Sequence, residues 1–64
     1  MANVNKVLTV KELSRYLGMS KETLRKYRMR GIGPEYAKIG RQVRYKFGDV
    51  LEWLELHKRE STAE

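Results

Sequence analysis

Apolar residues recur at helical spacing near the start of the chain and define a first short helix. Leu13 and Leu17 lie four residues apart, so they share one helical face. Thr9 stands just before this segment with Glu12 three residues later, which is the spacing of a capping box. A glycine follows Leu17 and favours a left-handed helix end. The pattern predicts a helix over residues 10–17.

A second helix is predicted directly after the first. Ser20 is a favourable N-cap, and Leu24 and Tyr27 then share one face. The glycine at position 31 stops this helix, which places it over residues 21–30. Two short helices joined by a turn of about three residues form a helix-turn-helix signature, which by itself is not specific for one function.

The next segment is predicted to be a β-hairpin. Residues 31–34, Gly-Ile-Gly-Pro, cannot continue a helix, because two glycines and a proline oppose it. Short segments of strand-like residues then flank Gly40, Arg41 and Gln42. We expect these three residues to form the hairpin loop.

The alternation of apolar and charged residues sets the expected register of the hairpin. A three-residue loop places the apolar residues of both strands on the inner face and leaves Lys38 and Arg44 on the outer face. The expected inner pairs are Ile39 with Val43 and Ala37 with Tyr45. A two-residue loop would set Lys38 opposite Val43 and mix charge with the apolar face, so the three-residue loop is favoured.

The last periodic segment predicts an amphipathic helix over residues 47–59. Its apolar stripe consists of Phe47, Val50, Leu51 and Leu54. Leu56 lies nearly opposite this stripe, and Trp53 lies between the two. We therefore expect the stripe to be buried and Leu56 to be exposed.

Together these elements predict one domain with the order α-α-β-β-α, mainly α with a small β-hairpin. A chain of 64 residues buries too little surface for two cores. The domain is expected over residues 8–59. A flexible arm over residues 1–7 and a polar tail over residues 60–64 are expected to flank it.

The composition argues against an enzyme and against a bound metal or cofactor. The chain has no Cys and a single His, His57, so neither a thiolate zinc site nor a Cys–His pair can form. No apolar segment approaches the roughly 20 residues that span a bilayer, and no signal peptide is recognisable. We expect a cytoplasmic protein with no membrane partner and no small-molecule ligand.

The positive charge is concentrated in the middle of the chain. The net charge is +6 overall, but it is +7 over residues 20–46, against +2 over residues 1–19 and −3 over residues 47–64. A nucleic acid favours such a concentration, because neutralised phosphates release their counterions. The alternative is a solvated surface. The position of these charges on a helix-turn-helix and a hairpin favours binding to DNA.

Residues 8–55 resemble the small excisionase and AlpA-like proteins, whose fold is related to the DNA-binding domain of MerR regulators. The motifs that carry the resemblance are Leu17-Gly18 before Ser20, Thr23-Leu24, Gly33-Pro34, Lys38-Ile39-Gly40-Arg41, Val43-Arg44-Tyr45, and Asp49-Val50 with Trp53-Leu54. The resemblance implies a winged helix-turn-helix that binds double-stranded DNA. It implies an excisionase that helps an integrase to excise a mobile element, or an AlpA-like transcription regulator. Cooperative self-association on adjacent DNA sites also follows as an expectation.

Side chains that leave the core face are the candidate DNA contacts. In the second helix they are Ser20, Lys21, Glu22, Thr23, Arg25, Lys26 and Arg30. In the hairpin they are Lys38, Arg41, Gln42 and Arg44. Arg and Lys of the helix can reach guanine edges, Ser20 and Lys21 suit phosphates, and the hairpin cations suit a minor groove. Met29 also points away from the core.

Two questions stay open from the residues alone. Glu22 on this face either pairs with Lys26 or accepts a hydrogen bond from a cytosine amino group. A function of another class is also available: an interaction module that uses the last helix, with Trp53 and Leu56 contacting another protein.

Overall fold

The computed structural model describes residues 5–61. Its elements are β1 (Val7–Thr9), α1 (Val10–Leu17), α2 (Lys21–Arg30), β2 (Ala37–Ile39), β3 (Gln42–Lys46) and α3 (Phe47–Ser61). The predicted bounds of α1 and α2 are confirmed, and α3 continues two residues beyond the predicted end. Most of the predicted arm, residues 1–4, and residues 62–64 of the predicted tail lie outside the described residues.

The predicted capping box begins α1. The Glu12 backbone N–H donates to the Thr9 hydroxyl at 3.0 Å, and the Thr9 backbone N–H donates to the Glu12 carboxylate at 2.9 Å. This second bond holds the pKa of Glu12 below its ordinary value. Gly18 ends the helix with a φ of 69°, in the left-handed region that glycine enters at little cost.

Local hydrogen bonds hold the turn between α1 and α2. The backbone N–H groups of Gly18 and Met19 both donate to the Ser14 carbonyl, at 2.9 and 3.1 Å. The Ser14 hydroxyl in turn donates to the Met19 carbonyl. Ser20 then begins α2 by accepting from the Thr23 backbone N–H at 3.1 Å. These bonds set the angle at which α2 leaves α1.

The sheet contains a strand that the sequence did not predict. Its order is β1-β3-β2, with both pairings antiparallel. β1 has only three residues, too few for a pattern to emerge, and Val7 falls within the expected arm. Its pairing with β3 sets Leu8 opposite Tyr45, and both side chains are buried. β1 therefore contributes to the core and fastens the start of the domain.

The predicted three-residue hairpin loop is wrong. Ile39 pairs with Gln42, so the loop consists of Gly40 and Arg41 alone. Gly40 has a φ of 63° and Arg41 has no positive φ, the pattern of a type II′ turn. Turn geometry therefore set the register, although it places Lys38 opposite Val43.

This shift by one residue turns over the side chains of β2. Lys38 lies on the face that carries Val43, whereas Ala37 and Ile39 lie on the outer face with Arg44. The predicted inner pairs of Ile39 and Ala37 are thus wrong, and so is the predicted shared face of Lys38 and Arg44. Ile39 is 67% exposed, because the hairpin extends beyond the core and offers nothing to bury it.

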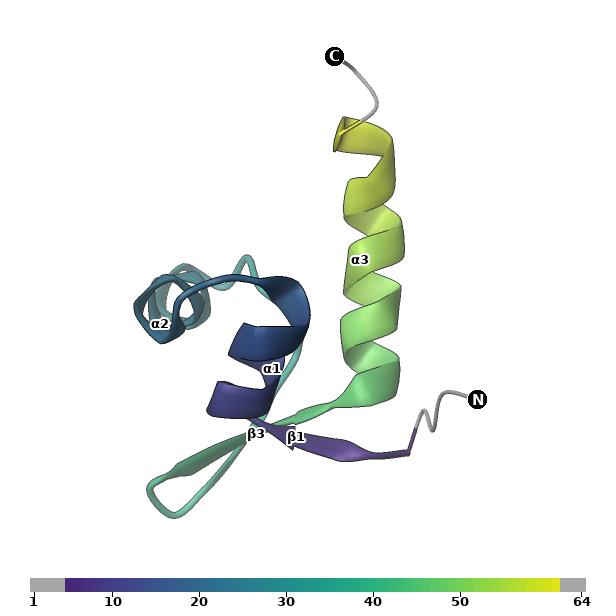
Figure 1. Cartoon of the computed structure of the whole chain (residues 1–64). Helices are drawn as coiled ribbons and strands as arrows, with labels where there is room; N and C mark the ends of the chain where they lie inside the picture. The colour runs from purple at the N-terminus through teal and green to yellow at the C-terminus, as the bar shows by residue number, and fades with distance from the viewer. Residues whose placement is uncertain (1–4, 62–64) are drawn as a thin grey trace.

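The core lies between the sheet and the helices. It consists of Leu8, Leu13, Leu24, Tyr45 and Val50. In Figure 1, α3 stands beside α1 and α2, and its C-terminal part extends past them, while the hairpin of β2 and β3 projects on the opposite side. The predicted fold, mainly α with a β wing, is confirmed. None of the helices in residues 5–61 is long and apolar enough to cross a bilayer.

Candidate nucleic-acid interface

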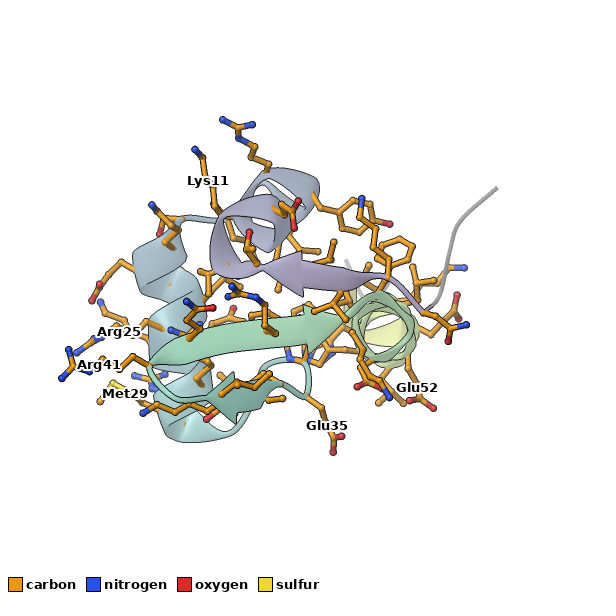
Figure 2. All side chains as sticks on the ribbon, turned by 90° about the horizontal axis from the view of Figure 1, so that it is seen from below. Lys11, Arg25, Met29, Glu35, Arg41 and Glu52 are labelled. Carbon is orange, nitrogen blue, oxygen red and sulfur yellow. The ribbon has the colours of Figure 1, made fainter. Side chains whose placement is uncertain are left out.

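A shallow hollow separates α2 from the hairpin. Its volume is about 340 Å³. Its walls come from α2, from the hairpin and from the loop between them; the residues are Arg25, Arg28, Met29, Tyr36, Lys38, Arg41 and Val43. In Figure 2, Arg25 and Arg41 point to the same side of the molecule, whereas Glu52 of α3 lies at the opposite side. The cations of two elements therefore present one surface.

The burial of Leu24 orients this surface. Leu24 is fully buried, and each following residue of a helix turns by about 100°. Arg25 and Lys26 consequently leave the core side, and both are exposed. Arg25 borders the hollow, whereas Lys26 and the exposed Arg30 do not line it.

Glu22 forms an ion pair within α2 with a residue that the sequence did not point to. Its carboxylate lies 3.3 Å from the Arg25 guanidinium, so the pair forms with Arg25 and not with Lys26. Both side chains are more than half exposed. Such a pair contributes little to stability, and it leaves Arg25 free to exchange Glu22 for another acceptor.

The hydroxyl groups at the start of α2 are engaged in hydrogen bonds that stabilise the helix itself. Ser20 caps the helix, and its hydroxyl lies 2.8 Å from the Thr23 hydroxyl. Both hydroxyls already have a partner within the helix. Lys21 is exposed at the same end and is the cation available there.

The structure divides the four predicted hairpin residues into two groups. Lys38 and Arg41 border the hollow together with Arg25. Arg44 lies on the outer face and donates to the Gln42 side chain at 2.5 Å and to the Val43 carbonyl at 2.9 Å. Gln42 and Arg44 thus bind one another on the face turned away from α2.

Arg28 also lines the hollow, although the sequence did not single it out. It donates to the Tyr45 hydroxyl at 2.8 Å, and its guanidinium carbon lies 5.8 Å from the centre of the Tyr36 ring. Arg28 therefore joins α2 to β3 and to the loop before β2. Arg28 follows Leu24 by four residues and so lies beside the buried side of the helix. This spacing could have indicated that Arg28 contacts another part of the fold.

The sequence profile of a helix-turn-helix domain family matches residues 7–57, most of the chain. The chain belongs to this family. This helix-turn-helix family includes excisionase and AlpA-like proteins. Membership of the family supports the conclusion that the chain is a DNA-binding protein. Domains of this family are typically not enzymes. Among curated proteins, none matches the chain at a significant level.

The last helix of this helix-turn-helix domain carries the other predicted site. Trp53 donates from its indole N–H to the Ile32 carbonyl at 2.9 Å, and its ring centre lies 4.5 Å from that of His57. Trp53 thus fastens α3 to the loop after α2. Leu56 is 70% exposed, as expected, and contributes nothing to the core.

No group of three or more His, Cys, Asp or Glu residues within 5–61 is arranged to hold a metal ion. The charged residues that line the hollow are all cations, which suit a polyanion.

Proposed function

We propose that α2 enters the major groove of duplex DNA while the hairpin tip contacts the adjacent backbone or minor groove. The observation that carries this proposal is the shared surface of Arg25, Lys38 and Arg41 on either side of the hollow. A helix and a wing set side by side fit the alternation of groove and phosphate backbone along a duplex. The acidic Glu52 lies on the far side (Figure 2), and Glu22 pairs with Arg25 of this surface.

Five of the predicted contacts on α2 have a role in this arrangement. Arg25 and Lys26 read base edges, because both leave the core side of α2 and carry long donor side chains. Lys21 contacts phosphate near the start of the helix. The hydroxyls of Ser20 and Thr23 act chiefly through the cap they already form.

The biological role we propose is that of an excisionase, or recombination directionality factor. The protein would bind and bend attachment-site DNA, assemble cooperatively on adjacent sites, and help an integrase to excise a mobile element. The strand-cleavage chemistry would belong to the integrase. The family match supports this role, since the family includes excisionase-like proteins.

An AlpA-like transcription regulator is the second candidate, because the same family includes it. An excision assay separates the two roles. It combines the purified protein with the integrase encoded nearest to its gene and a circularising substrate. Excision that depends on the protein supports the excisionase role. Excision without dependence on it, together with a footprint over a promoter, supports the regulator.

Arg41→Ala tests the wing. Arg41 lies in the exposed hairpin loop, so its loss should leave the thermal midpoint unchanged. The slope of log affinity against log salt concentration should fall in magnitude by about 1, because one phosphate contact is lost. The measurement is a titration of a labelled duplex at several salt concentrations.

Lys58→Ala is the matched control for this titration. It removes the same charge from α3, where Lys58 is 70% exposed and pairs with the equally exposed Glu55. Its salt slope should equal that of the wild type. Equal slopes for the wild type and Arg41→Ala would show that Arg41 makes no contact with a phosphate.

A further inference from the structure

Met29 departs from the chemistry of its surroundings. Its side chain is 72% exposed, the highest value among the exposed large hydrophobic residues of the described chain. It belongs to α2, where its spacing from the buried Leu24 turns it away from the core. The other exposed residues of this helix are all charged, so Met29 is the one apolar residue among them. Because Met29 is exposed, packing in the core does not explain why an apolar residue stands at this position.

The geometry places Met29 within the cationic surface. Arg25 precedes it by four residues, one helical turn, and both line the hollow with Arg41 of the hairpin tip. Figure 2 shows the labelled Arg25, Met29 and Arg41 together at one side of the molecule. An apolar group thus lies beside cations that come from two different elements.

We infer that Met29 contacts the 5-methyl group of a thymine in the major groove and thereby contributes to sequence selection. This inference rests on the proposed binding of α2 in that groove. The phosphates are charged and offer no apolar surface to a methionine side chain. Of the four bases, only thymine presents a methyl group on the major-groove edge. An unbranched, flexible methionine can adjust its length to reach such a group. Arg41 holds a neighbouring phosphate and Arg25 reads an adjacent base, which together position Met29 over the base edges.

The test uses duplexes selected from a randomised library by the wild-type protein. Each thymine of the selected site is replaced in turn by deoxyuridine, which removes only the methyl group. At one position the wild type should bind about fourfold more weakly. Met29→Ala should bind the thymine and deoxyuridine duplexes equally, while Met29→Leu should retain the difference. Met29→Gln, of similar length but polar, should lose it.

Leu56→Ala is the matched control, because Leu56 is 70% exposed and lies on α3. It should keep both the affinity and the thymine preference of the wild type. Insensitivity of the wild type to every replacement, or an unchanged preference in Met29→Ala, would overturn the inference while leaving DNA binding intact. Failure of the wild type to bind any duplex at low salt would overturn the proposed binding mode and the inference together.

Discussion

Leu24→Ala is expected to lower the free energy of unfolding by about 2 to 5 kcal/mol, the usual range for truncating a buried leucine. Leu24 is fully buried and is the one residue of α2 in the core cluster. A domain of this size has little stability in reserve, so the loss should leave much of the protein unfolded at room temperature. Thermal and urea unfolding followed by circular dichroism measure the effect. DNA binding should fail with the fold.

The control for this prediction is Leu56→Ala. It makes the same chemical change at a side chain that is 70% exposed, and its effect should stay within about 0.5 kcal/mol. If Leu56→Ala were the more destabilising of the two, the rotational phase assigned to α3 would be wrong. If Leu24→Ala and Leu56→Ala both had a small effect on stability, the placement of Leu24 in the core would be contradicted.

Tyr45→Phe is expected to lower the free energy of unfolding by about 1.5 to 3 kcal/mol, the range for a hydrogen bond to a charged group. The variant retains the buried ring but removes the hydroxyl that accepts from Arg28 at 2.8 Å. Duplex affinity should also fall, although no charge is removed, because the bond joins α2 to β3, the strand that forms part of the hairpin. Urea unfolding and duplex titration measure the two effects.

A double-mutant cycle separates this bond from other effects of the substitution. If the bond is as described, Tyr45→Phe should add almost nothing to the cost of Arg28→Ala. Additive costs would show that the two side chains are not coupled. Tyr36→Phe is the matched control: it preserves the ring that faces Arg28 at 5.8 Å, so stability should be nearly unchanged.

The sequence determined the helices because their signals are local. The start of α1 is marked by a capping box at Thr9 and Glu12, and the start of α2 by a cap at Ser20. A glycine ends each of these two helices. All of these residues act within a few positions of the backbone that they stabilise. The periodicity that oriented Leu24 also oriented Arg25, Lys26 and Met29, since a helix relates its residues by a constant rotation. The fold class and the outward face of α2 could therefore be predicted.

The sheet and the relation between helix and wing were decided only by the tertiary structure. β1 is too short to show a pattern, and it forms because β3 supplies its hydrogen-bond partners. The hairpin register followed the turn that Gly40 permits, which moved Lys38 to the face of Val43 and left Arg44 on the other. Arg28 found its partner in Tyr45, 17 residues away, and no local pattern encodes such a contact.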